Sequence, residues 1–444
     1  MDHDSSDKPE IVIAGAGWSG LAAAVQLCKH GFSVNLLEAA QQAGGRARSI
    51  IIDQQSLDNG QHILLGAYQN VLKLLSLLNI NEKDVLLRQP LQLNIHGPME
   101  TGIRIKTANL FSPMHILLGI MTAKGFSIYE KILLLRAMFS FRLKKFTINQ
   151  DISVLSLLQK NKQTPRIIKL FWEPVCVAAL NTQIDKASAG VFLQVLKKSF
   201  TGHRRNSDLL LPRVRLGQLM PSQAVEYIRH HNNPIHFNER VTQLIINKQG
   251  IRSVKTSKRN HACRHLILAL PYKQSQQLLE DHDRFKQHLN MSTFEYEPVT
   301  TVYLQYPEQI KLKNNIAGAV DCTAQWLIDR GSCGQPGLIA AVISAGGPHQ
   351  KLDKHSLTNK VISEITLLYP AWPAPLKTWL IREKQATFSC NFKTNHLRPD
   401  KYSLGSNIWL AGDFIDQKLP ATLEAAVQAG LQCANQLIKQ IKRT

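Results

Sequence analysis

The fold is decided by the stretch Ile11-Val12-Ile13-Ala14-Gly15-Ala16-Gly17-Trp18-Ser19-Gly20-Leu21-Ala22-Ala23-Ala24-Val25. Its apolar start predicts a buried strand, its glycines predict a tight turn, and its alanine-rich end predicts a helix. In a unit of this kind Gly15 permits the turn, Gly17 lets the backbone approach a pyrophosphate, and Gly20 lets the helix pack close to the strand. The helix N-terminus, which holds Trp18 and Ser19, then faces the phosphates. We therefore predict a dinucleotide-binding site here.

A second strand is predicted at residues 33–37, and it ends in Glu38, 18 residues after Gly20. An acidic side chain at this distance accepts hydrogen bonds from a ribose diol, and it would repel a 2′-phosphate. The ligand is therefore FAD or NAD rather than NADP. A glycine-rich turn in an unrelated βαβ unit is the alternative, and the combination of strand, spacing and acid argues against it.

Both ends of the chain favour FAD over NAD. Gly44-Gly45-Arg46 follow Glu38 closely, where flavoproteins of the amine oxidase and carotenoid desaturase type have a glycine pair and an arginine, and Arg46 can hold the pyrophosphate with its planar fork. Residues 407–413 predict a buried strand that closes on Gly412-Asp413, and residues 419–426, with Thr422, predict the start of the last helix. In flavoproteins of this shape the carboxylate binds the ribitol chain, and the helix N-terminus faces the flavin.

The composition describes a large, basic, globular chain. Its 444 residues are 44% hydrophobic, which is enough for two domains with large cores. The formal charge of +21 would attract nucleic acid or an anionic membrane. Because the basic residues are dispersed and no nucleic-acid motif is present, we expect no nucleic-acid partner and favour a membrane surface. A generally basic, solvated surface would explain the charge equally well.

Compartment signals point to the cytoplasm. The seven cysteines are scattered, with no CxxC pair, which favours reduced thiols and argues against disulfides or a metal site. Residues 1–8 are polar and have no secretion signal. No uninterrupted apolar stretch approaches the roughly 20 residues that span a bilayer. We expect a cytoplasmic protein, attached peripherally to the inner face of the membrane.

The positions of the FAD signals predict an α/β fold with a discontinuous, Rossmann-like FAD-binding domain and an inserted α+β substrate domain. Residues 1–64, 206–274 and 396–444 are assigned to the first domain, and residues 65–205 and 275–395 to the second. A strand is expected at residues 234–241, a hairpin at 244–254, and a buried strand at 265–271.

Two segments of the first insert, residues 111–121 and 132–146, combine apolar side chains with basic residues at their rims. This is what an interfacial helix pair needs. Helices buried in a core have the same pattern, so it does not by itself decide between the two. The hydrophobic substrate discussed below favours the interfacial reading.

Asp58-Asn59-Gly60-Gln61-His62, together with residues 170–182, 187–189, 207–214 and 411–424, resembles the hydroxysqualene dehydroxylases. These flavoproteins of bacterial hopanoid biosynthesis are related to phytoene desaturases and amine oxidases. The likeness covers nearly the whole chain but is weak between residues 310 and 395, apart from residues 326–330. It implies that the Val241 backbone contacts the adenine and that Gly60, Gln61 and His62 lie at the flavin. It also implies an isoprenoid substrate, hydroxysqualene, and contact with upstream squalene-pathway enzymes.

The resemblance implies removal of the hydroxyl of hydroxysqualene by a hydride from reduced flavin, which gives squalene. Because hydroxide leaves poorly, the site has to protonate the departing oxygen or stabilise an allylic cation. His62 is one candidate acid. Glu173 is another, since a carboxyl between Trp172 and Pro174 is expected to have a raised pKa. His62 could instead stabilise the turn or contact flavin, and Glu173 could cap a helix or form an ion pair; Asp329 is the next candidate.

Other functions fit parts of the pattern. A carotenoid-type desaturase would run the same fold in the oxidising direction on a polyene. A flavin amine oxidase would need an aromatic cage and often a lysine–water pair, neither of which can be located in the sequence. A flavin-bound assembly factor without catalytic activity belongs to a different class, and extractable flavin with a turnover assay would separate it from the enzymes.

Overall fold

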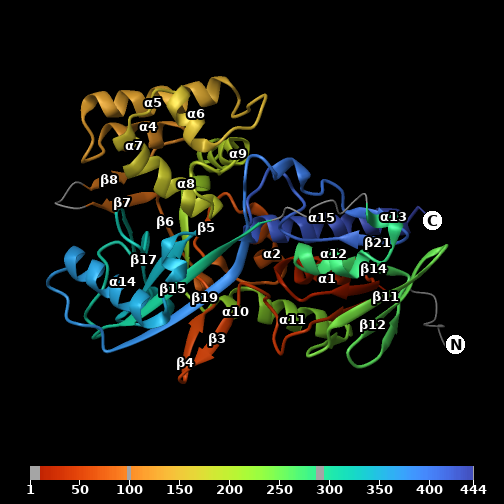
Figure 1. Cartoon of the computed structure of the whole chain (residues 1–444). Coiled ribbons are helices and arrows are strands. Elements are labelled where there is room, and N and C mark those ends of the chain that lie inside the picture. The colour runs from red at the N-terminus through yellow and green to blue at the C-terminus, as the bar shows by residue number, and fades with distance from the viewer. Residues whose placement is uncertain (1–10, 98–101, 287–294, 444) are drawn as a thin grey trace.

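The computed structural model describes residues 11–97, 102–286 and 295–443. Within these ranges the chain forms two sheet-based bodies that lie side by side and a lobe of helices above one of them (Figure 1). Residues 1–8, from which the absence of a secretion signal was predicted, lie outside the described part. No helix in that part is long and apolar enough to cross a membrane.

The first body is built on a six-stranded sheet whose central strands are parallel. Its strand order is β10 (Ile235–His236), β2 (Val34–Leu37), β1 (Ile11–Ala14), β14 (His265–Leu268), β21 (Ile408–Leu410) and β20 (Ser403–Gly405), with β20 antiparallel to β21. The helices α1 (Trp18–Lys29), α11 (Pro221–His230) and α15 (Leu423–Ile441) belong to the same body, and α1 packs on both of the others. The α/β fold with a parallel sheet, predicted from the sequence, is confirmed.

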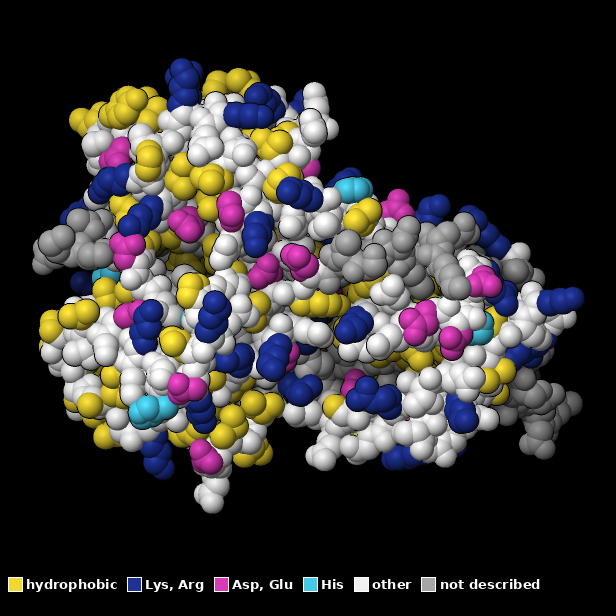
Figure 2. Space-filling view, in the orientation of Figure 1, with side chains coloured by type: hydrophobic (Ala, Val, Ile, Leu, Met, Phe, Trp, Pro, Cys, Tyr) yellow, Lys and Arg dark blue, Asp and Glu magenta, His cyan; other side chains and the backbone are white. Residues whose placement is uncertain are grey.

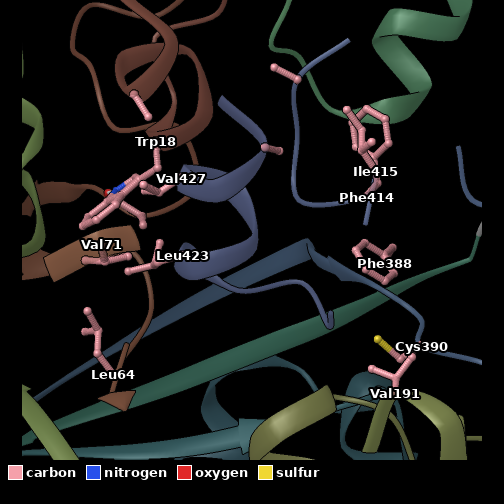
Figure 3. Packing of buried hydrophobic residues seen from close by; sticks show 14 of the residues in the cluster. Trp18, Leu64, Val71, Val191, Phe388, Cys390, Phe414, Ile415, Leu423 and Val427 are labelled. Carbon is pink, nitrogen blue, oxygen red and sulfur yellow. The ribbon is translucent and has the colours of Figure 1, made fainter. Parts of the chain in front are cut away.

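Helix α15 is fixed to both α1 and α2 (Gln69–Leu77) by buried apolar side chains. Figure 3 shows Trp18 of α1 beside Val427 of α15, and Val71 of α2 close to Leu423, at the start of α15. All four side chains are buried in the same core. The packing sets the N-terminus of α15 next to that of α2.

The register of the parallel strands brings distant loops to one edge of the sheet. Ala14 pairs with Leu37 on one side and with Leu268 on the other, and Leu268 pairs with Leu410. The carboxyl ends of β1, β2 and β21 therefore lie together, and ligands of open α/β sheets bind at this edge.

The expected strand at residues 234–241 is wrong in part. Only Ile235–His236 joins the sheet, as β10 beside β2. Asn238 then adopts a positive φ of 54°, which turns the chain out of the sheet, and Val241 begins a separate antiparallel unit. That unit, β11 (Val241–Asn247), β12 (Gly250–Thr256) and β13 (Asn260–Ala262), contains the predicted hairpin.

The second body is built on a seven-stranded mixed sheet. Its order is β19 (Lys377–Phe388), β15 (Tyr296–Gln305), β18 (Leu338–Ser344), β17 (Trp326–Asp329), β16 (Ile316–Ala319), β7 (Gln92–His96) and β8 (Ile103–Lys106). Helix α14 (Lys354–Leu368) packs its apolar side chains against this sheet. Two small sheets adjoin the bodies, β3 (Ser49–Ile52) with β4 (Gln55–Asp58), and β5 (Leu64–Leu65) with β9 (Leu209–Pro212) and β6 (Leu86–Gln89). The predicted domain boundaries stay a prediction.

The helical lobe comprises six helices of the described chain, which follow β8 and precede β9. They are α4 (Met114–Met121), α5 (Ile128–Leu143), α6 (Val154–Lys160), α7 (Pro165–Ile167), α8 (Glu173–Leu180) and α9 (Ala189–Phe200). The lobe lies above the seven-stranded sheet, with α5 on its outer side (Figure 1). Helix α5 begins with a capping box in which the Ser127 hydroxyl accepts from the Glu130 N–H and Glu130 accepts from the Ser127 N–H.

Candidate functional site

The turn between β1 and α1 is built for a close-lying ligand. Gly15 has a φ of +103°, and a Cβ on Gly20 would lie 1.9 Å from the Gly15 carbonyl oxygen, so both glycines are required by the local geometry. No side chain caps the N-terminus of α1. The buried Ser19 hydroxyl, in the first turn, has no hydrogen-bond partner. Free N–H groups and an unpartnered hydroxyl at a helix N-terminus fit a phosphate.

The second glycine segment lies against this turn, whereas the Trp18 side chain points away from it into the core. The backbone of Gly17 forms an isolated bridge with Gly44, and a Cβ on Gly45 would lie 3.1 Å from the Gly17 Cα, so the two glycine segments lie against each other. The Trp18 side chain, in contrast, is buried in the core and donates to the Ala47 carbonyl oxygen at 3.2 Å. Its indole is a packing group, and only its backbone belongs to the turn.

Glu38 lies at the end of β2, and its carboxylate is oriented by two backbone donors. The N–H of Ala16 donates to Oε2 and the N–H of Ala40 donates to Oε1, each at 2.8 Å. The Glu38 carbonyl accepts from the Glu239 N–H at 2.8 Å, which brings the chain before Val241 next to this carboxylate. Glu38 therefore lies close to the start of β11, and the predicted contacts of Glu38 with a ribose and of Val241 with an adenine stay predictions.

Arg46 and Asp413 come from opposite ends of the chain and form an ion pair, with Arg46 Nη2 at 2.8 Å from Asp413 Oδ2. Arg46 also donates to the Ala386 carbonyl oxygen at 2.8 Å. The guanidinium predicted to hold the pyrophosphate and the carboxylate predicted to hold the ribitol are thus direct partners. A buried arginine that the sequence reading missed, Arg398, donates to the Phe414 carbonyl oxygen and so holds the loop that carries Asp413.

The N-terminus of α15 completes this end of the site. Thr422 is the N-cap, and its hydroxyl accepts from the Ala425 N–H. Glu424, in the first turn, accepts from the N–H groups of Asn70 and Val71 and so caps α2 as well. Gly412 is required for a packing reason, because a Cβ there would lie 2.3 Å from the Phe414 ring. These helix N-termini and the Arg46–Asp413 pair fit the polar half of an FAD molecule.

A buried network fixes the Asp58-Asn59-Gly60-Gln61-His62 motif. Arg330 Nη2 donates to Asp58 Oδ2 at 2.7 Å, and its Nη1 donates to Gln61 Oε1 at 3.0 Å. The Tyr303 hydroxyl accepts from the Gln61 amide and donates to the Asp58 carbonyl oxygen. No motif in the sequence pairs Arg330 with Asp58. Gln61 is thereby held in one orientation, and Gly60, where a Cβ would meet nothing within 4 Å, leaves space in front of the motif.

A large, mostly apolar cavity connects this motif with the helical lobe. At one end it is lined by polar groups and the start of α15, which include Arg46, Asn59, Gly60, Gln61, His62, Glu383, Thr387 and Thr422. At the other end it is lined by Ile116, Ile120, Met138, Phe171 and Phe200 of the lobe. The walls between them are chiefly leucine, isoleucine and valine side chains. Such a cavity holds a long apolar ligand with one end at the polar groups.

His62 lines the cavity, but its ring is not protonated there at neutral pH. Burial is the main cause that lowers its pKa from 6.5 to about 4, with Arg46 lowering it further and Asp58 opposing the shift. The ring is therefore neutral at pH 7. This argues against His62 as an imidazolium acid and fits its other predicted role, contact with the flavin.

Glu173 is not a cavity residue, which corrects its assignment as a candidate acid. Partial burial and the charges of Asp185 and Asp321 raise the pKa of its carboxyl, against the effect of Lys169, as expected in direction. The residue is nevertheless exposed, at the first position of α8, whereas the cavity is lined by Phe171 and Val175 on either side of it. Glu173 is therefore not among the side chains that line the cavity.

Asp329, the next candidate acid, has a structural role. Its Oδ2 accepts from the Leu312 N–H and its Oδ1 accepts from the Gly331 N–H, each at 2.7 Å. Glu383 of β19 and Glu424 of α15 both line the cavity, and Glu383 accepts from the Asn59 amide at 3.0 Å. No motif in the sequence marks Glu383 as a site residue. It reaches the site because β19, which carries it, lies next to Asn59 in the folded chain.

Comparison with known proteins agrees with this geometry. A family model described as flavin containing amine oxidoreductase matches residues 18–438. A hydroxysqualene dehydroxylase of Zymomonas mobilis is 26% identical and aligns over 95% of this chain and 97% of its own length. A zeta-carotene desaturase of Arabidopsis thaliana is 22% identical over 96% of this chain and 85% of its own. Among solved structures, the cyclohexylamine oxidase of Brevibacterium oxydans superimposes with a TM-score of 0.72 at 14% identity, covering 98% of this chain and 100% of that one.

Proposed function

The chain belongs to the flavin containing amine oxidoreductase family and is an FAD-dependent oxidoreductase, and on that premise we propose that it reduces hydroxysqualene to squalene in hopanoid synthesis. The observation that carries the proposal is the cavity, which is mostly apolar and reaches the polar groups at the FAD end. A thirty-carbon chain with one hydroxyl matches that distribution. The similarity to hydroxysqualene dehydroxylases over nearly the full chain supports the same reaction.

The reaction replaces a C–OH bond with a C–H bond and releases water. Bound and reduced, FAD supplies the hydride for the new C–H bond. The protein has to hold the substrate carbon in line, exclude bulk water from the apolar part, and deliver one proton to the departing oxygen. The network of Gln61, Arg330 and Tyr303 helps to hold the substrate carbon in line, because it fixes the amide of Gln61 at the cavity wall.

We assign the handling of the proton to Glu383. Two carboxyl groups of the described residues line the polar end of the cavity. That of Glu424 caps a helix, whereas that of Glu383 does not. Asn59 donates to one carboxyl oxygen of Glu383, which orients the group. In this place the Glu383 carboxyl can accept a hydrogen bond from the substrate hydroxyl and take part in the proton transfer, whereas the His62 ring is neutral and is not an imidazolium acid.

The test is squalene formation by purified protein with chemically reduced FAD and hydroxysqualene under argon. Glu383→Gln should lower the rate by about 10²–10⁴-fold, as expected for the loss of general acid catalysis, with the FAD content unchanged. Glu173→Gln, at the exposed start of α8, is the matched control and should keep the full rate. Full activity of Glu383→Gln would remove the assigned role, and loss of FAD would show that the residue serves cofactor binding instead.

A desaturase acting on a carotenoid-type polyene is the second candidate. Similarity to zeta-carotene desaturases supports it, and the same apolar cavity would accept a polyene. The two reactions differ in direction, since a desaturase starts with oxidised FAD and bleaches it. An amine oxidase fits less well, because the one lysine among the described residues that line the cavity, Lys198, belongs to the lobe end rather than the FAD end.

We also place the protein in the cytoplasm, peripherally on the inner face of the membrane and in contact with upstream enzymes of squalene synthesis. The reason is chemical, because a thirty-carbon isoprenoid does not cross water at a useful concentration. The net charge of +21 supports attraction to anionic lipids. Retention of the protein on membranes from its own cells at low salt, and its release at high salt, would test the placement.

A further inference from the structure

Helix α5 has two apolar faces, and only one of them is used by the core. Leu133, Leu134, Ala137 and Phe141 are buried against the lobe. On the opposite side Ile128, Ile132, Phe139 and Leu143 are exposed, with Ile128 at 78% and Phe139 at 61%. Their positions recur at helical spacing, so they form one continuous outer face. A helix that only closed a core would carry polar side chains there.

The adjoining helix α4 repeats this arrangement. Ile116 and Ile120 are buried, whereas Met114, Leu118 and Met121 are exposed. Phe111, in the turn before α4, is 72% exposed. Together these side chains define the outer lobe surface, which consists of Phe111, Met114, Leu118, Met121, Ile128, Ile132, Phe139 and Leu143. Contiguous exposed apolar side chains of this extent mark a binding surface.

Positive charge surrounds the outer lobe surface. Lys124, Arg136, Arg142, Lys144 and Lys145 are exposed on or beside the two helices. The one acidic residue between 103 and 146, Glu130, is buried and is paired with Arg166 at 2.7 Å. Figure 2 shows apolar side chains in yellow next to dark-blue basic side chains along the top of the lobe. The combination of apolar and basic side chains with no exposed acid matches an anionic lipid surface.

The same helices form the wall of the substrate cavity. Ile116 and Ile120 line it from α4 and Met138 lines it from α5. The outer lobe surface is therefore separated from the lobe end of the cavity by the thickness of one helix layer. Docking at this surface would bring the lobe end of the cavity within one helix layer of the lipid.

We propose that the outer lobe surface of α4 and α5 inserts into the headgroup region of an anionic bilayer and seats the lobe end of the cavity against the lipid. The outer lobe surface is the observation that supports docking. The delivery of substrate from the lipid to the cavity rests on the proposed function. A second copy of this chain is a poorer occupant, because two such basic surfaces would repel each other.

The test uses the FAD-loaded protein and vesicles of phosphatidylglycerol and phosphatidylcholine in a flotation assay. The wild-type protein should float with the vesicles, and less so as salt is added. Ile128→Ser/Ile132→Ser/Phe139→Ser should lower the partition coefficient by about 100-fold or more, because three side chains lose the free energy of burying apolar surface. All three are exposed in the folded protein, so the FAD content should stay the same.

The matched control is Ile51→Ser/Leu367→Ser/Leu376→Ser, which removes three apolar side chains of similar exposure outside the lobe. Ile51 lies on β3, at the opposite end of the molecule from α5 (Figure 1). This control should float like the wild type. Equal flotation of the wild type and both variants, equal loss in both variants, or no flotation of the wild type would overturn the proposal.

Two further measurements separate the possible failures. Gel filtration reports self-association, and a wild-type dimer that the lobe variant converts to monomer while vesicle binding stays unchanged would make a second copy the occupant. Turnover of detergent-dispersed hydroxysqualene should be unaffected in the lobe variant. Flotation that depends on the lobe, without turnover in any form of the protein, would leave the docking surface valid and contradict the proposed reaction.

Discussion

The guanidinium of Arg330 lies 2.7 Å from the carboxylate of Asp58, although 272 residues separate them in the sequence. Both side chains are almost fully buried. Asp58 also accepts from the Leu216 N–H and the Ser49 hydroxyl, so the pair joins three distant segments behind the cavity. Through Gln61, which Arg330 also contacts, this pair determines the shape of the polar end of the site.

Breaking this pair should destabilise the protein strongly. Arg330→Ala leaves the Asp58 carboxylate buried without its counter-charge, which is expected to lower the free energy of unfolding by about 3–5 kcal/mol. Urea denaturation monitored by fluorescence would measure it. Lys169→Ala is the control, because Lys169 pairs with Asp321 at the surface and its loss should cost less than about 1 kcal/mol. Similar losses for both variants would contradict a special role for the buried pair.

FAD should be bound non-covalently and should depend on Glu38. Acid precipitation should release the yellow chromophore, and flavin that stays with the polypeptide would refute this. Glu38→Arg replaces an acceptor for the ribose with a donor and should abolish FAD retention. Flavin content per protein after gel filtration measures the effect. Glu226→Arg, at an exposed position of α11, tests the same change of charge away from the site and should keep its FAD.

The stability of the folded protein should depend on His62 in weak acid. Its pKa is lowered, chiefly by burial, from 6.5 to about 4, so the unfolded chain binds a proton at higher pH than the folded chain does. His62 therefore costs no stability above about pH 6.5 and destabilises the fold as the pH falls from there towards 4. His62→Gln should give a shallower loss of unfolding free energy across this window. Parallel curves for variant and wild type would contradict the lowered pKa.

Glu424 should connect the start of α15 to α2. Glu424→Ala removes the acceptor for the N–H groups of Asn70 and Val71 and is expected to lower the unfolding free energy by about 1–3 kcal/mol. Glu424→Gln keeps one acceptor oxygen and should cost less. Thermal denaturation of the FAD-loaded variants measures both, and an unchanged midpoint for Glu424→Ala would show that other groups cap α2.

The elements of the FAD-binding part could be predicted mostly from signals between residues close in sequence. The strand, turn and helix at residues 11–25, and the strand ending in Glu38, depend on residues close in sequence, and the structure contains them as β1, α1 and β2. The turn at Asn238 was missed because a positive φ at asparagine has no strict sequence signal.

The errors at the site arose where a residue's position depends on contacts between segments far apart in sequence. Glu173 follows a π-helical segment, Ile168–Trp172, and is exposed, whereas Phe171 and Val175 line the cavity. Glu383 and Arg330 lie at the site only because β19 and the end of β17, both from the second body, come next to Asn59 and Asp58. No spacing rule in a single sequence encodes that crossing.

The absorbance of the flavin shows whether the reduced protein converts hydroxysqualene to squalene. The protein is reduced under argon until the yellow absorbance is lost, and hydroxysqualene is then added in detergent. We expect the absorbance to return and one squalene to form for each flavin that is reoxidised. A flavin that stays bleached with hydroxysqualene, while the oxidised protein is bleached by a carotenoid-type polyene, would contradict it.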